Sequence, residues 1–179
     1  MNEPPRNFGN DLSWSLEGGH ESFWLAVYRK AFPNLRHQEL CEDLARQRQG
    51  IDRVLYLSNG NVLYVDEKKR GRVYGDILLE VLSNEERNTL GWIEKDLTMD
   101  YLAYGFLPNK RCYLFPWPIL RRAWLQFGDT WKRKYGVKRS STQVGFNGIY
   151  HTVNVPVPID VLQRAVTTAA IIDVSDLVK

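Results

Sequence analysis

Apolar residues concentrate in two short runs on either side of a polar tetrapeptide. Residues 51–57 and 62–65 are rich in β-branched, aromatic and aliphatic side chains, and the tetrapeptide between them reads Ser58-Asn59-Gly60-Asn61. An Asn-Gly pair between two such runs is the strongest short-range signal of a β-hairpin. The pattern therefore predicts two antiparallel strands joined by a tight turn.

The rest of the pattern predicts a mixed α/β domain. Helical periodicity, with prolines that fit helix ends, predicts helices over residues 22–32, 35–47, 118–135 and 158–170. Apolar runs between turn signals predict further strands over residues 77–82, 101–106, 111–117 and 151–157. No internal repeat or linker divides the chain. We therefore expect one domain over residues 1–179, with residues 1–12 disordered because of their proline, asparagine and glycine content.

The register of the predicted hairpin decides which acidic residues meet, because a slip of one residue moves every side chain to the other face. With a two-residue turn, Asp52 lies opposite Glu67 and shares a face with Lys69. With a three-residue loop whose glycine is left-handed, Asp52 lies opposite Asp66 and shares a face with Lys68. Both registers pair two carboxylates with a lysine.

Two carboxylates beside a lysine suit the metal-dependent cleavage of a phosphodiester. Such carboxylates can hold Mg²⁺ or Mn²⁺, and Mg²⁺ keeps several waters and also binds a substrate phosphate. The lysine can orient the attacking water or neutralise charge that develops on the phosphate. An acid-x-Lys triplet also arises by chance about once or twice in a chain of this length, and edge strands carry Lys and Glu against aggregation. The coupling of the triplet to Asp52 through a hairpin favours the functional interpretation.

The segment from Gln47 to Leu55, taken with Val62 to Lys68, resembles the core hairpin of the PD-(D/E)XK nuclease superfamily. The similarity is greatest to members with a Gln-x-x-Gly-Ile-Asp and Asp-Glu-Lys pattern, and it extends over roughly residues 40–120. It implies a restriction-endonuclease-like core, in which helices flank a central mixed β-sheet. Ile51 stands where the family name places proline.

The resemblance also implies a set of site residues. Asp52 and Asp66 would be metal ligands and Lys68 the catalytic lysine, while Glu67 belongs to the alternative register. A further acidic ligand is implied on the helix before the first core strand, where residues 35–47 offer Glu39, Glu42 and Asp43, with Glu42 the residue assigned to the metal. Charges that flank an apolar helical stripe are also typical of its solvated face.

Glu80 interrupts an otherwise apolar predicted strand. A buried carboxylate is costly unless it is paired or metal-bound, so Glu80 is a candidate for the same site. The competing interpretation is a strand with one partly exposed face.

Two basic clusters predict contacts with nucleic acid. One follows the acid-x-Lys triplet, and the other ends the predicted helix 118–135 beside Trp131 and Tyr135; their members are Lys69, Arg70 and Arg72, and Lys132, Arg133 and Lys134. A basic aromatic surface can follow a phosphate backbone and stack bases. Cations at a helix C-terminus are equally typical of a solvated helix end.

Composition narrows the class of protein further. The chain has 179 residues, 44% of them hydrophobic, a net charge of +3 and two cysteines outside any Cys-x-x-Cys pattern. It has no apolar run long enough for a membrane span, and its N-terminus lacks the apolar stretch of a signal peptide. We expect a cytoplasmic protein with no membrane partner.

Two functions remain open at this point. The first is a Mg²⁺- or Mn²⁺-dependent nuclease that acts on nucleic acid, with DNA the expected substrate and a homodimer allowed by exposed aromatic residues. The second is a noncatalytic nucleic-acid-binding or assembly protein on the same fold.

Overall fold

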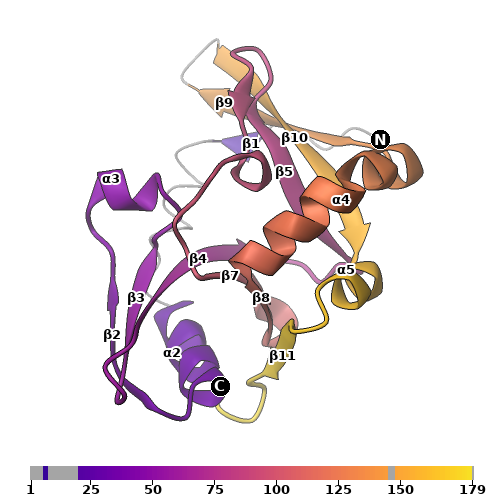
Figure 1. The fold of residues 1–179 in the computed structure, drawn as a ribbon. Helices are drawn as coiled ribbons and strands as arrows, with labels where there is room; N and C mark the ends of the chain where they lie inside the picture. The colour runs from indigo at the N-terminus through magenta and orange to yellow at the C-terminus, as the bar shows by residue number, and fades with distance from the viewer. Residues whose placement is uncertain (1–5, 8–19, 145–147, 179) are drawn as a thin grey trace.

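The computed structural model describes residues 6–7, 20–144 and 148–178, which form two β-sheets with helices packed against them (Figure 1). The strands are β1 (Arg6–Asn7), β2 (Leu35–Leu40), β3 (Arg53–Leu57), β4 (Val62–Arg70), β5 (Asp76–Asn84), β6 (Thr89–Leu90), β7 (Tyr101–Phe106), β8 (Arg111–Pro116), β9 (Lys138–Val144), β10 (Gly148–Pro158) and β11 (Ala170–Asp173). The helices are α2 (Glu21–Ala31), α3 (Leu44–Gln47), α4 (Trp117–Tyr135) and α5 (Ile159–Ala165), with short 3₁₀ turns η2 (Trp92–Glu94) and η3 (Leu107–Asn109). The disorder expected for residues 1–12 falls outside the described residues except at β1.

The larger sheet has the strand order β11-β8-β7-β4-β3-β2. Its neighbours are antiparallel except for β4 and β7, which run parallel, so the sheet is mixed as predicted. The second sheet has the order β1-β9-β10-β5-β6. The predicted strand 77–82 exists as β5, but it belongs to this second sheet and not to the sheet of the hairpin.

Helices cover both faces of the larger sheet (Figure 1). Phe23, Trp24 and Val27 of α2 share one buried core with Leu55 and Val65 of the hairpin. The opposite face supplies side chains such as those of Leu102 and Tyr104 to a second core, which lies beneath α4 and the second sheet. Alternation along β4 therefore directs successive side chains either toward α2 or toward α4.

The hairpin has the register of the three-residue loop. Arg53 pairs with Val65, the Leu57 N–H donates to the Asn61 carbonyl at 2.9 Å, and Gly60 has a φ of +86°. Continued by one residue, this register sets Asp52 opposite Asp66. The alternative register, which would set Asp52 opposite Glu67, is excluded.

The helix predicted over residues 35–47 is wrong. Residues 35–40 form the edge strand β2, antiparallel to β3, and helix begins only at Leu44, after Asp43 caps it by accepting from the Ala45 and Arg46 N–H groups. The backbone N–H and C=O groups of residues 35–40 form hydrogen bonds with the free edge of β3. In a helix, the same groups would have to find their partners within the segment itself. The weak apolar stripe of this segment did not distinguish the two.

Two further differences from the predicted pattern concern the chain after α4. The basic residues Lys138 and Arg139 begin a strand, β9, that pairs with β10. Helix α5 ends at Ala165, and residues 170–173 form β11 at the edge of the larger sheet. No helix in the described part of the chain is both long and apolar enough to cross a membrane.

Candidate active site

A cleft of about 260 Å³ lies where β4, the turn after α3 and the β5–η2 segment converge, and its lining consists of Gln47, Arg48, Gly50, Asp52, Asp66, Lys68, Glu80, Trp92, Lys95 and Leu97. Asp66 and Lys68 point to the α4 side of the sheet, because their partners in β7 are the buried Leu102 and Tyr104. The cleft thus opens on the face shared with the second sheet. Three of the residues predicted for catalysis, Asp52, Asp66 and Lys68, meet in it.

The contacts among Asp52, Asp66 and Lys68 are direct. Asp52 Oδ2 accepts the Glu67 N–H at 2.9 Å, and the neighbouring Asp66 carboxyl is close enough to raise the pKa of Asp52. Lys68 Nζ donates to Asp66 Oδ1. Asp66 is 3% exposed, whereas the Lys68 side chain keeps about a third of its surface accessible. The two carboxyl groups therefore share one cleft, with the Lys68 cation beside them.

Burial dominates the electrostatics of these groups. It raises the pKa of Asp52 to about 7, with Lys68 acting against the shift and the neighbouring Asp66 adding to it. Burial lowers the pKa of Lys68, but the charges of Asp66 and Asp52 outweigh this effect and the pKa is raised overall. Lys68 is therefore protonated at neutral pH, and Asp52 is a carboxyl that readily exchanges a proton there.

Glu80 reaches the same cleft from β5. Burial raises the pKa of its carboxyl, while Lys68 and the Trp92 N–H, which donates to it, act in the opposite direction. Strand β5 has one buried and one partly exposed face, and Glu80 lies at a half-buried position on the second face, from which it lines the cleft with Lys68.

The donor set of the cleft is compatible with a hard divalent cation. Asp52 and Asp66 offer carboxylate oxygens, and Mg²⁺ is typically bound by one or two carboxylates with substrate phosphate and water as its other ligands. A cation between the two would offset a repulsion that otherwise raises a carboxyl pKa. In the described part of the chain, no group of three or more His, Cys, Asp or Glu side chains is arranged to hold a metal ion. The protein itself would thus supply only a minority of the ligands.

Glu67, predicted as an alternative ligand, faces the other side of the sheet. Its Oε1 accepts from Arg53 Nε at 2.6 Å and from the Tyr28 hydroxyl at 2.9 Å. Arg53 is 1% exposed, and its two terminal nitrogens donate to both carboxylate oxygens of Glu21 at 2.8 and 2.7 Å. Glu67 is therefore not placed to bind a metal in the cleft, and the prediction that it is an alternative ligand is wrong. The ion network of Arg53, Glu67, Glu21 and Tyr28 lies directly behind the cleft.

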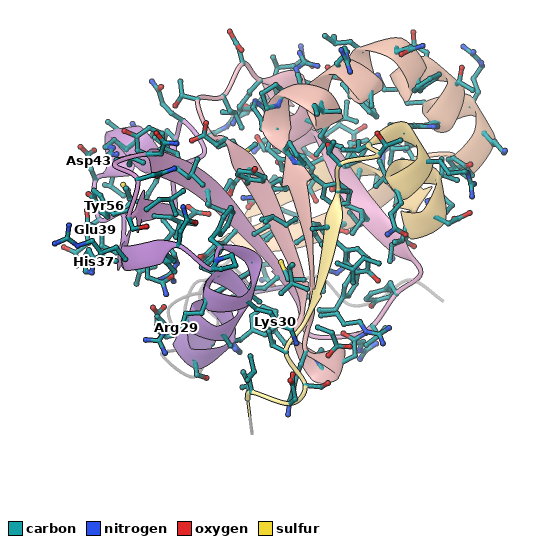
Figure 2. All side chains as sticks on the ribbon, turned by 60° about the horizontal axis from the view of Figure 1, so that its bottom comes forward. Arg29, Lys30, His37, Glu39, Asp43 and Tyr56 are labelled. Atoms are coloured by element: carbon teal, nitrogen blue, oxygen red, sulfur yellow. The ribbon has the colours of Figure 1, made fainter. Side chains whose placement is uncertain are left out.

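The acidic residues of the segment predicted as a helix also lie outside the cleft. Glu42 is exposed in the turn between β2 and α3 and is not part of the cleft lining. Glu39 Oε1 accepts from the Tyr56 hydroxyl at 2.7 Å, next to His37, at the outer edge of the sheet (Figure 2). Asp43 is used as the cap of α3. The implied third acidic ligand from residues 35–47 is therefore not present, since these residues form an edge strand and a single helical turn.

The first basic cluster divides between the two faces of β4. Arg70 lies over the ring of Tyr74 at 4.3 Å and donates to the Tyr104 hydroxyl at 3.1 Å, on the face of Lys68. Lys69 alternates to the opposite face, and Arg72 is exposed in the turn after β4. Only Arg70 extends the line of Asp66 and Lys68 along the strand.

The second basic cluster is not organised around an accessible aromatic platform. Trp131 is 5% exposed and packs against Trp124 and Phe127 in the core. Lys132 pairs with Glu94 at 3.4 Å, while Arg133 and Lys134 are exposed. Base stacking on Trp131 is therefore excluded, while Tyr135 is half-buried and lies beneath Lys134, whose Nζ is 5.4 Å from the ring centroid.

Two cations of the cleft were missed from the sequence. Arg48 comes from the end of α3, and Lys95 follows η2. Neither belongs to a basic cluster or to an apolar periodic segment. They join the site because residues 47–50 and 92–97 lie on either side of the hairpin strands; the resemblance included Arg48 in its segment without giving it a role, and no local signal indicated Lys95.

Gly91 fixes the η2 wall of the cleft through a close approach of two backbones. A Cβ at this position would lie 2.1 Å from the Glu80 carbonyl oxygen. We expect Gly91→Ala to displace β5 from η2 and to lower the free energy of unfolding by about 1 to 3 kcal/mol, as overpacking does elsewhere. Denaturant unfolding measures the change. Gly75→Ala is the matched control, because a Cβ there meets nothing within 4 Å; equal stability of the two variants would contradict the prediction.

Comparison of the chain with protein-family models, with curated proteins and with solved structures finds no match.

Proposed function

We propose that this chain is a divalent-metal-dependent nuclease with a restriction-endonuclease-like core. The observation that carries the proposal is the convergence of Asp52, Asp66 and Lys68 in one cleft, in the hairpin register that the resemblance to PD-(D/E)XK nucleases requires. The parallel pairing of β4 with β7, in a sheet covered by helices on both faces, is consistent with such a core. DNA is the proposed substrate.

Each charged residue of the cleft would have its own role in hydrolysis. Asp52 and Asp66 would hold Mg²⁺ or Mn²⁺, which when bound polarises a phosphoryl oxygen and favours ionisation of a water. Lys68 carries a fixed positive charge beside the reacting phosphate, where it stabilises negative charge that develops during hydrolysis. Glu80 is within reach of the same space and is suited to accept a proton from an attacking water, because burial raises its pKa.

A noncatalytic nucleic-acid-binding or assembly protein is the competing function. It is favoured by the small number of acidic ligands that the described residues bring to the cleft, and by the ion pair of Lys68 with Asp66. Against it, a noncatalytic protein has no need to bury two carboxyl groups beside a single lysine, since burial raises the pKa of Asp52 and makes its charged form costly.

The test is cleavage of plasmid, linear duplex and single-stranded DNA in the presence of Mg²⁺ or Mn²⁺, compared with EDTA. We expect metal-dependent cleavage, and a loss of at least about a hundredfold in the double variant Asp66→Asn, Lys68→Met. Both residues are changed together because removing one would leave the other buried and unpaired. Tight binding of Mg²⁺ by calorimetry, lost in the same variant, is the readout that does not depend on activity.

The control is an acid–cation pair of the same kind outside the cleft. Asp160 and Arg164 form an exposed pair at 2.8 Å on α5, so Asp160→Asn with Arg164→Gln should leave cleavage unchanged. Cleavage that persists in the Asp66, Lys68 double variant would show that another site, or another protein in the preparation, is responsible. Absence of cleavage and of Mg²⁺ binding in the unmodified protein would favour the noncatalytic function.

A further inference from the structure

The depth of the cleft limits what can reach its carboxyl groups. Asp66 is 3% exposed and Asp52 is also largely covered, so a phosphate must enter the cleft to approach them. The residues that surround this space come from three separate segments. The arrangement of those segments therefore limits which substrates can reach the carboxyl groups, in addition to positioning the catalytic residues.

The two walls of the cleft meet at one end. The Thr98 N–H donates to the Gln49 carbonyl at 3.1 Å, and a Cβ on Gly50 would lie 3.2 Å from Leu97 Cδ1. The wall formed by the end of α3 is also held in place, since Gln47 Nε2 donates to the carbonyl of Cys41, the residue that follows β2, at 2.6 Å. A substrate strand cannot pass between the two walls at this end, and we call the space between them the slot.

The slot is small compared with a DNA duplex. At about 260 Å³ it lies just below the roughly 300 to 1,000 Å³ of pockets that hold drug-sized ligands. The major groove of B-form DNA alone is about 12 Å wide, and the base pairs are stacked behind the backbone. A paired and stacked nucleotide would have to leave the duplex to enter such a slot.

Cations stand on each wall and on the floor of the slot. Arg48 lies on the α3 wall, Lys95 on the η2 wall and Lys68 on the floor between them. Trp92 also borders the cleft, but it is 7% exposed and packs against Trp117, so it offers no face for base stacking. The contacts that the cleft offers to a strand are therefore its charges, which can follow a phosphate backbone.

We infer that the cleft accepts an unpaired DNA strand, held through its phosphates by Arg48 and Lys95, and that intact duplex is a poor substrate. The inference rests on the proposed nuclease function but concerns which nucleic acid the site admits. Binding alone can test it, without any cleavage.

The experiment measures fluorescence anisotropy of one labelled oligonucleotide, single-stranded or annealed to its complement, with the full chain in EDTA. We expect the single strand to bind at least about tenfold more tightly than the duplex. Arg48→Ala and Lys95→Ala should each weaken single-strand binding and reduce the slope of log affinity against log salt by about 0.7. Arg36→Ala, an exposed cation on β2, is the matched control and should change neither quantity.

The possible outcomes separate the two proposals. Equal or tighter binding of duplex, no binding of either form, or cleavage of duplex as fast as of single strand would overturn the inference and leave metal-dependent cleavage to be judged by its own assay. Selective single-strand binding without any metal-dependent cleavage would support the inference and contradict the nuclease function. Circular dichroism confirms that Arg48→Ala and Lys95→Ala retain the fold.

Discussion

Replacing Arg53 by methionine is expected to lower the free energy of unfolding by about 3 to 5 kcal/mol, because the change leaves the buried carboxylate of Glu67 without its cation. Arg53 is 1% exposed and donates to both Glu67 and Glu21. Burial raises the pKa of Glu67, and Arg53 is the first of the groups that hold this rise in check. Without Arg53, Glu67 must either take up a proton or remain charged beneath α2.

Denaturant unfolding of a small set of variants measures this effect and its origin. Arg53→Lys keeps the charge but not the two-nitrogen fork that contacts Glu21, so an intermediate loss is expected. The triple variant Arg53→Met, Glu67→Gln, Glu21→Gln removes the charges together and should be more stable than Arg53→Met alone. A loss below about 1 kcal/mol for Arg53→Met would contradict the prediction.

The second large effect is a gain in stability. Asp52→Asn should raise the free energy of unfolding of the metal-free protein by about 2 to 4 kcal/mol near pH 8, since a shift of one pKa unit corresponds to about 1.4 kcal/mol. The asparagine can still accept the Glu67 N–H, and its amide can donate to Asp66 where the native carboxylate is repelled. A residue proposed for metal binding would thus reduce stability in the absence of its ligand.

The pH dependence of the Asp52→Asn effect follows from the direction of the shift. Burial raises the pKa of Asp52 from its ordinary value to about 7, so the folded state binds a proton that the unfolded state has released. Stability from this group is therefore lost as pH rises from about 4 to about 7, and the full cost applies above that. The gain in Asp52→Asn should be largest near pH 8 and should disappear as pH falls toward about 4.

Thermal unfolding across this pH range, with and without Mg²⁺, provides the measurement. Mg²⁺ should stabilise the native chain at about pH 8 and should have much less effect on Asp52→Asn. Asp160→Asn, at an exposed position on α5, serves as the control and should show no comparable gain. A destabilised Asp52→Asn protein, or a gain independent of pH, would contradict the role assigned to burial.

The amino-acid sequence determined the parts of this protein that depend on local patterns. The strands β3 and β4, helix α2 and the long helix α4 follow from apolar runs, an Asn-Gly turn and prolines near helix ends. The sequence also restricted the candidate site to two pairs, Asp66 with Lys68 or Glu67 with Lys69. These signals succeed because the groups they depend on are only a few residues apart.

Only the tertiary structure decided between the two pairs and completed the site. One loop residue sets the register, so the whole pairing of Asp52 depends on the left-handed conformation of Gly60. Residues 35–40 became a strand because β3 offered them a free edge. Arg48 and Lys95 entered the cleft because distant segments pack against β4, and Glu67 left it because strand alternation turned it toward Arg53. Such long-range packing is not encoded in any local period, and so the cations on the walls of the site could not be read from the sequence, although its floor and the candidate Glu80 could.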